Sequence, residues 1–110
     1  MDDRGQQDEI LFERQARICR VLADAKRLRL LSALRAGERS VGELAGALGI
    51  SYPNASQHLS MMRDAGVLAT RREGTTVFYR LAYPRIVDAC DIVHDILRAQ
   101  LADAAALAGR

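Results

Sequence analysis

The residues whose types suit molecular recognition lie together in the stretch from Ser51 to Gly66, SYPNASQHLSMMRDAG. Helical spacing gathers its polar side chains on one face. Their hydroxyl, amide, imidazole and guanidinium groups hydrogen-bond readily to base edges and phosphates. The pattern therefore predicts a DNA-reading helix. Its candidate contact residues are Tyr52, Asn54, Ser56, Gln57, His58 and Arg63.

Different contacts are expected from different residues of this face. Asn54, Ser56, Gln57 and His58 are candidates for base contacts, and the Gln57 amide can bond an adenine edge at two atoms. Arg63 better suits a phosphate. His58 falls between the outward and inward faces of the helix, so packing against the wing, the hairpin that follows, is an equally good interpretation.

The ends and the inner face of this helix are also readable. Ser51 is placed to cap it, Pro53 fits its first turn because the missing N–H costs nothing there, and Gly66 ends it. Tyr52, in the same first turn, is placed to touch the DNA backbone. The inward apolar stripe consists of Ala55, Leu59 and Met62.

Two helices are expected near the start of the chain. Residues 1–7 are polar and are expected to be disordered, and apolar residues at helical spacing predict a first helix from about Asp8 to Leu22. The run AKRLRLLSALRAG predicts a second helix, which Gly37 stops.

A third, short helix is expected directly before the DNA-reading one. Ser40 and Glu43 have the spacing of a capping box, and the apolar residues after them predict a helix to about Leu48 that ends at Gly49. Two helices joined by a tight turn, the second polar outside, are the parts of a helix-turn-helix.

A basic hairpin and a long helix complete the predicted order of elements. We expect strands at Val67–Arg72 and Thr76–Ala82 joined by the turn Glu73-Gly74-Thr75, which makes the hairpin a wing. A last helix over 84–107 carries a continuous apolar stripe. The hairpin residues placed to reach phosphates or a minor groove are Arg71, Arg72 and Thr75.

Composition sets the class of protein. The 110 residues suit a single small domain, mainly α, with 49% hydrophobic residues and only 5% aromatics. A net charge of +2 fits DNA as a partner and fits an ordinary soluble protein equally well. No apolar run is long enough for a membrane span, and the polar start is no signal peptide, so a cytoplasmic protein is expected. No catalytic pairing or glycine-rich phosphate loop is found, so no enzyme is expected.

Four segments together resemble one family. VLADAKRLRLLSAL at 21–34, ERSVGELAGALGIS at 38–51, SQHLSMMRDAGVL at 56–68 and RREGTTVFYRL at 71–81 are similar to the ArsR/SmtB winged-helix repressors of bacteria. The resemblance implies an α-α-α-α-β-β-α chain and a homodimer held by its first and last helices. It also implies a repressor that leaves its promoter when an inducer binds.

A two-fold dimer predicts the form of the operator. Two reading helices would enter successive major grooves of double-stranded DNA, so the operator is expected to be an imperfect palindrome with half-sites about 10 bp apart, or slightly more. The apolar stripes of residues 10–22 and 86–101 are consistent with the implied interface, although packing within one chain explains them too.

The metal sites familiar in this family are not repeated here. Ser40 stands where the resemblance would place a ligand cysteine, and the positions matching the zinc ligands of the last helix hold Tyr83, Arg85 and Ile96. Cysteines of the family's thiol sensors lie elsewhere, where this chain has Ser32. A different sensor chemistry is therefore needed, if the chain has one.

Cys19 and Cys90 are the remaining candidates for sensing. One lies on each helix that the resemblance assigns to the interface, so a disulfide or persulfide switch is one interpretation. Asp88 and Asp91, if close, would raise the pKa of Cys90. A second interpretation is a site for a thiophilic ion such as arsenite, Cu(I) or Zn, and the third is inert buried thiols. The ion site would use Cys19, Cys90, His94 and Asp91.

A winged-helix module that contacts another protein is the alternative from a different class, because fold alone does not fix function. Salt distinguishes the two, since DNA binding weakens steeply with ionic strength and an apolar protein contact does not.

Overall fold

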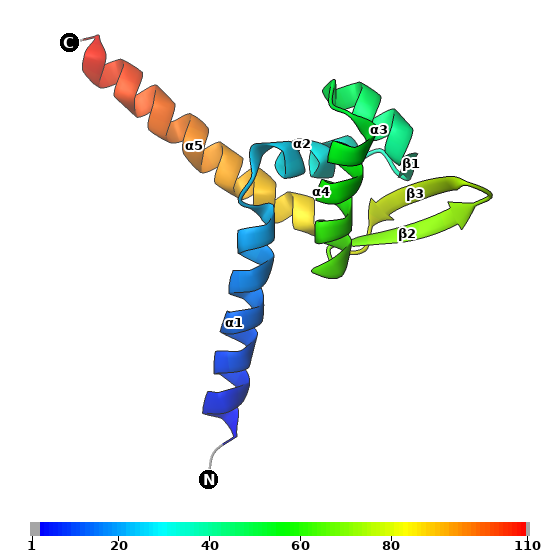
Figure 1. Cartoon of the computed structure of the whole chain (residues 1–110). Helices are drawn as coiled ribbons and strands as arrows, with labels where there is room; N and C mark the ends of the chain where they lie inside the picture. Colours follow the sequence, from blue (N-terminus) through cyan, green and yellow to red (C-terminus); the bar gives the residue numbers. More distant parts are fainter. Residues whose placement is uncertain (1–2, 110) are drawn as a thin grey trace.

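The computed structural model describes residues 3–109 and has a compact head from which two long helices project (Figure 1). The head contains α2 to α4 and the three strands, and the projecting helices are α1 and α5. In chain order the elements are α1 (Arg4–Leu22), α2 (Ala25–Ala33), β1 (Arg39–Ser40), α3 (Val41–Leu48), α4 (Tyr52–Asp64), β2 (Leu68–Glu73), β3 (Thr76–Leu81) and α5 (Ile86–Ala108).

The strands form one antiparallel sheet in the order β1-β3-β2. Glu73 pairs with Thr76, so the turn between β2 and β3 consists of only two residues, Gly74 and Thr75, and the expected three-residue turn was wrong. The short strand β1, which pairs with Phe78 and Tyr79, was not predicted. Two residues are too few to produce a readable alternation of apolar and polar side chains.

Local signals in the sequence set the ends of the central helices. The predicted capping box is present, with the Ser40 hydroxyl accepting from the Glu43 N–H at 3.1 Å and the Glu43 carboxylate accepting from the Ser40 N–H at 3.2 Å. Gly49 ends α3 with φ 68°, a left-handed conformation that favours glycine. Ser51 then caps α4, as predicted.

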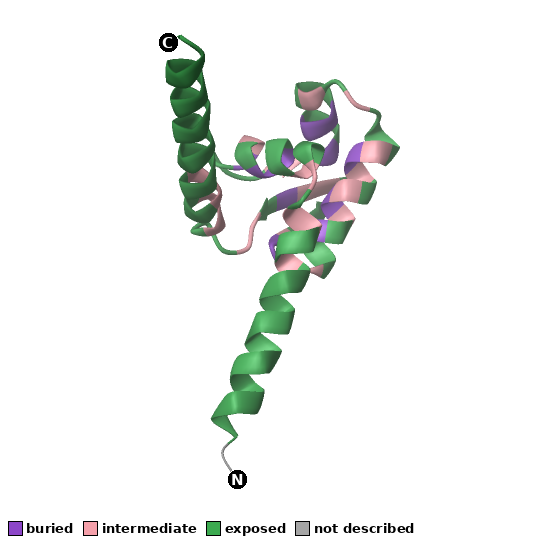
Figure 2. Ribbon diagram, turned by 90° about the vertical axis from the view of Figure 1, so that its left-hand side faces the viewer, coloured by how far each residue is buried: buried purple, intermediate pink, exposed green. Residues whose placement is uncertain are grey.

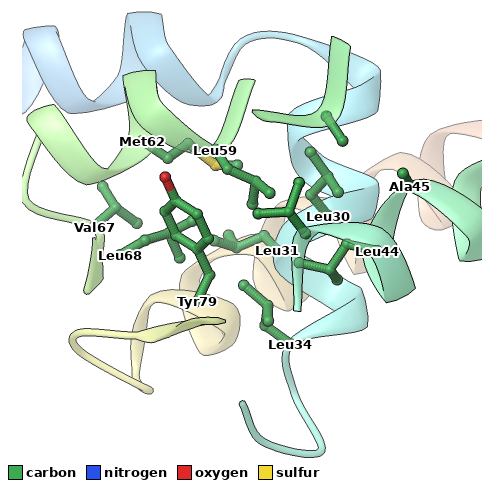
Figure 3. Packing of buried hydrophobic residues seen from close by; sticks show 12 residues of the cluster. Leu30, Leu31, Leu34, Leu44, Ala45, Leu59, Met62, Val67, Leu68 and Tyr79 are labelled. Carbon is green, nitrogen blue, oxygen red and sulfur yellow. The ribbon is translucent and has the colours of Figure 1, made fainter. Parts of the chain in front are cut away.

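The core lies where α2, α3 and α4 meet the sheet (Figure 3). Its side chains come from all of these elements, so they hold α4 against the rest of the head. The expected inward stripe of α4 is confirmed, because Ala55, Leu59 and Met62 are fully buried. The other core residues are Leu30, Leu31, Leu34, Val41, Leu44, Ala45, Val67, Leu68 and Tyr79.

The two terminal helices differ from prediction at their ends. α1 begins at Arg4, so the expected disorder is wrong for residues 4–7; residues 1 and 2 lie outside the described part. Charged and amide side chains of good helix propensity extend it, although no residue of α1 is buried. α5 begins at Ile86 rather than 84, because Pro84 and Arg85 form a turn, and it runs to Ala108.

α1 and α5 are exposed along most of their length (Figure 2). The radius of gyration is 17.4 Å, whereas a compact chain of this length has about 13 Å. Large apolar side chains lie uncovered on both helices, among them Phe12 at 70% and Val93 at 66% exposure. Within residues 3–109, no helix is long and apolar enough to cross a membrane.

The arrangement is a winged helix-turn-helix, as predicted. α3 and α4 form the helix-turn-helix, and the hairpin of β2 and β3 forms the wing, which extends away from α1 and α5 in Figure 1.

Candidate nucleic-acid interface

The predicted contact residues of α4 occupy its outer face and the borders of that face. Tyr52, at 50% exposure, Gln57 and Arg63 are exposed, and Ser56 and His58 are half-buried. The core stripe on the opposite side fixes the rotation of the helix, so the exposed side chains follow from the same spacing that buries Leu59. The surface is polar and offers both donors and acceptors.

Asn54 is turned further inward than expected. Its backbone N–H donates to the Ser51 hydroxyl at 3.2 Å, which caps the helix. Its side-chain oxygen is buried and has no hydrogen-bond partner in the described part of the chain. A buried acceptor without a partner is unusual. The predicted base contact of Asn54 would therefore use the amide nitrogen or require the side chain to turn.

His58 forms a hydrogen bond to α2 that was not predicted from the sequence, and packing against the wing, its predicted alternative, stays a prediction. The Nε of Arg27 donates to Nδ1 of His58 at 3.1 Å. Asp24 lies at the start of α2, and the hydrogen bond from the Arg27 backbone N–H lowers the pKa of its carboxyl group. The contact joins the reading helix to α2.

Arg71 and Arg72 occupy different environments in the wing. The Arg71 guanidinium donates to Glu38 at 2.7 Å and to Glu73 at 2.9 Å, and lies 4.5 Å from the centre of the Phe78 ring. The hydrogen bond from Arg71 lowers the pKa of Glu38. Arg72 is exposed and makes no ion pair within residues 3–109.

The start of α4 and the turn of the wing lie on one hollow. Tyr52 and Thr75 both line it, together with Ser40 and Gly42 at the start of α3. Two predicted contact residues that are 23 positions apart in the sequence therefore meet beside the α3 N-terminus. The Ser40 hydroxyl and the Glu43 carboxylate already cap this helix start, so the groups that remain for a phosphate are the Tyr52 and Thr75 hydroxyls.

Two residues of this region were not predicted. Arg27 and Glu38 lie outside the helix and the hairpin that carry the contact residues, yet each binds one of those residues directly. The helical pattern showed Arg27 only as one of several basic residues on α2. No sequence signal indicated that Glu38 would neutralise Arg71.

Arg63 is held loosely, by its neighbour in the sequence. Its guanidinium donates to the Asp64 carboxylate at 3.2 Å, and both side chains are exposed. Exposed pairs of this kind contribute little to stability, so Arg63 can exchange this partner for a phosphate.

The candidate sensor residues are not assembled within one chain. Cys19 is exposed, Cys90 is half-buried, and both are free thiols. Burial, and to a smaller extent Asp91, raises the pKa of Cys90, while Arg35 opposes the shift. The Asp91 carboxylate accepts two hydrogen bonds from Arg35, one of 3.0 Å, so it is not a free metal ligand.

No metal-binding cluster accompanies these thiols. Within residues 3–109, no group of three or more His, Cys, Asp or Glu side chains could hold an ion. The predicted set of Cys19, Cys90, His94 and Asp91 is therefore not brought together by a single chain.

Comparison with known proteins gives one consistent result. Residues 24–70 match the family described as bacterial regulatory protein, arsR family. The uncharacterized HTH-type transcriptional regulator Rv0081 of Mycobacterium tuberculosis (strain ATCC 25618 / H37Rv) is 35% identical over 102 residues, which cover 92% of this chain and 90% of that protein.

Solved structures agree with the fold. A homodimeric winged helix-turn-helix DNA-binding domain, fragment 1–100 of Mb0332 from Mycobacterium bovis, has a TM-score of 0.79 at 31% identity, with 92% of this chain and 94% of that chain covered. The transcriptional repressor BigR from Xylella fastidiosa has a TM-score of 0.70 at 33% identity, with coverage of 87% and 96%.

Proposed function

Because the chain belongs to the ArsR family of bacterial regulatory proteins, we propose that it is a cytoplasmic, homodimeric repressor that binds operator DNA through α4 and the wing. The family consists of transcription regulators rather than enzymes. The observation that carries the proposal is the polar outer face of α4. Burial of the apolar stripe on the opposite side fixes the rotation of the helix, so this polar face points to solvent.

The DNA contacts divide between bases and phosphates. Gln57, Ser56 and His58 are proposed to read base edges, with Asn54 joining them through its amide nitrogen. Arg63 and Arg72 are proposed to bind phosphates, as are Tyr52 and Thr75 beside the α3 N-terminus. Arg71 is proposed to stabilise the wing rather than to bind DNA, because the carboxylates of Glu38 and Glu73 already neutralise its charge.

Dimerisation is proposed to cover the exposed apolar faces of α1 and α5. Isolated chains rarely leave such continuous apolar surface open to water, and the extended shape of this chain fits a subunit whose partner is absent. Mb0332, which is described as homodimeric, shares the fold over nearly its whole length. A two-fold dimer requires an operator with two inverted half-sites.

Release from the operator is proposed to follow a change at this same interface. Cys19 on α1 and Cys90 on α5 are the candidate sensors, through a disulfide or persulfide link or through an ion such as arsenite held between subunits. Inert thiols remain the competing interpretation, and the raised pKa of Cys90 supports it.

The test of DNA binding uses fluorescence anisotropy with duplex DNA from upstream of the gene. The proposal predicts binding that weakens steeply as salt rises from 50 to 200 mM, by about 10³-fold if roughly six phosphates are contacted. A protein-binding module would give weak binding to DNA with no sequence preference.

The sensor test compares the reduced protein with oxidised, polysulfide-treated and arsenite-treated protein in the same assay. Mass spectrometry locates any link between Cys19 and Cys90. If each treatment leaves the affinity unchanged and Cys→Ser variants behave normally, the thiols are inert and the effector acts elsewhere.

A further inference from the structure

The side chain of Arg27 joins three helices of the head. Arg27 is half-buried in the first turn of α2, and its guanidinium donates in three directions. Nη1 donates to the Val21 carbonyl oxygen in the last turn of α1 at 2.9 Å. Nε donates to Nδ1 of His58 at 3.1 Å, and Nη2 contacts the Met61 sulfur at 2.9 Å, both on α4. Arg27 thus links the end of α1 to the middle of α4.

The geometry of this contact determines which tautomer of His58 fits it. A guanidinium group has donors and no acceptor, so Nδ1 must provide the lone pair. A neutral imidazole with its lone pair on Nδ1 carries its hydrogen on Nε2, and a doubly protonated ring has no acceptor at all. The contact with Arg27 is therefore compatible only with the Nε2–H tautomer.

We propose that Arg27 is a positioning residue for DNA recognition: it holds His58 as the Nε2–H tautomer, so that α4 presents a hydrogen-bond donor that selects an acceptor atom of the operator. This inference rests on the proposed DNA-reading role of α4. Nε2 has no hydrogen-bond partner in the described part of the chain. Suitable acceptors are guanine N7 and O6, adenine N7, thymine O4 and phosphate oxygens, whereas cytosine presents the N4 donor.

Arg27 acts through His58 and not as a phosphate ligand. Its donors are directed at Val21, His58 and Met61, so few remain for DNA. A phosphate-binding arginine would contribute about one phosphate per subunit to the salt dependence, and a positioning residue contributes none. This difference separates the two roles by measurement.

The first test is a long-range ¹H–¹⁵N spectrum of the imidazoles in the wild-type protein, at a pH where they are neutral. His58 is expected to show the Nε2–H tautomer alone. Exposed His94, the other histidine of the chain, is expected to show a mixture of the two tautomers and serves as the internal reference. A protonated Nδ1 on His58 in the wild-type protein overturns the proposal, whatever the variants do.

The second test is a double-mutant cycle on operator binding with Arg27→Met and His58→Phe. Each single change is expected to weaken specific binding about tenfold, because one hydrogen bond is lost in each half-site and each contributes roughly threefold. The double variant is expected to lose about tenfold as well, because the two residues act as one unit. A loss of about a hundredfold, or a lower salt slope in Arg27→Met, overturns the proposal. Arg29→Met, an exposed arginine on the same helix, is the matched control and should keep the base preference.

Operator variants identify the acceptor. If a base analogue that lacks one of these acceptors, such as 7-deazaguanine for guanine N7, weakens wild-type binding but not His58→Phe at one position of each half-site, that atom is the acceptor; if only methylphosphonate linkages do so, it is a phosphate. Insensitivity of both proteins to base and phosphate changes overturns the proposal. A wild-type protein that selects no duplex overturns the proposed function and this inference together, whereas selective binding with independent Arg27 and His58 effects overturns this inference alone.

Discussion

Two neighbouring arginines of the wing, Arg71 and Arg72, differ in their ion-pair partners and therefore in their expected roles. Arg71 and Arg72 are both basic, but successive side chains of a strand point to opposite faces. Arg71 shares its face with Phe78 and is bound by Glu38 and Glu73, whereas Arg72 shares the face of Val77 and makes no ion pair within residues 3–109. The sequence showed two equivalent cations, because Glu38 lies more than 30 positions from Arg71.

This difference predicts unequal effects on DNA binding. Arg72→Ala is expected to weaken binding and to lower the slope of log affinity against log salt by about one for each wing. Arg71→Ala is expected to change the slope much less, since its charge is already neutralised. Anisotropy titrations at several salt concentrations measure both, and equal slopes for the two variants would contradict the assignment.

The raised pKa of Cys90 predicts how the reactivity of its thiol depends on pH. Thiolate is the reactive form, and the raised pKa leaves less of it at any pH below the titration. In the Cys19→Ser variant, alkylation of Cys90 by iodoacetamide at pH 7.5 is expected to be slower than in the same protein unfolded in urea. The gap should close as the pH rises above the folded pKa. Equal rates at pH 7.5 would show that burial does not protect the thiol.

The elements that hold the reading helix are the part of the fold that the sequence predicted best. Ser40, Glu43, Gly49 and Ser51 are short-range signals that act within one turn, so their effects can be read without knowing the rest of the structure. The short strand β1 depends on pairing with β3, and the contact of Arg27 with His58 depends on packing α2 against α4. Neither has a local signature.

Gly46, inside α3, and Gly49, its C-cap, allow a matched test of these short-range signals. An added Cβ meets nothing within 4 Å at either Gly46 or Gly49, but only Gly49 has a positive φ. Gly46→Ala is expected to stabilise the protein by about 0.5–1 kcal/mol, because alanine favours a helix interior. Gly49→Ala is expected to destabilise it by about 1–2 kcal/mol, the cost of a left-handed alanine. Urea unfolding measures both, and effects of the same sign would contradict the assignment.

At the scale of the whole molecule, the head and the two projecting helices differ in how much apolar surface they bury. The head buries its own core, whereas α1 and α5 contain no fully buried residue and leave several of their large apolar side chains exposed. A sequence pattern can show an apolar stripe but cannot show what covers it. The extended shape leaves both stripes open, as the proposed second subunit requires.

A charge on the exposed stripe of α5 is therefore expected to separate the subunits without unfolding the head. Leu97→Glu should give a monomer in sedimentation experiments, keep the core folded, and lose most of the affinity for a two-site operator. Ala102→Glu adds the same charge on the other side of the helix and is the control. A Leu97→Glu protein that stays dimeric would place the interface elsewhere.

Selection of binding sites from random duplex DNA tests whether a two-fold dimer reads DNA through the outer face of α4. The wild-type protein is expected to enrich an inverted repeat with half-sites about 10 bp apart, or slightly more. Gln57→Ala is expected to change the enriched bases and to leave the spacing of the half-sites unchanged. Enrichment of no motif, or an identical motif for Gln57→Ala and the wild type, would contradict this mode of reading.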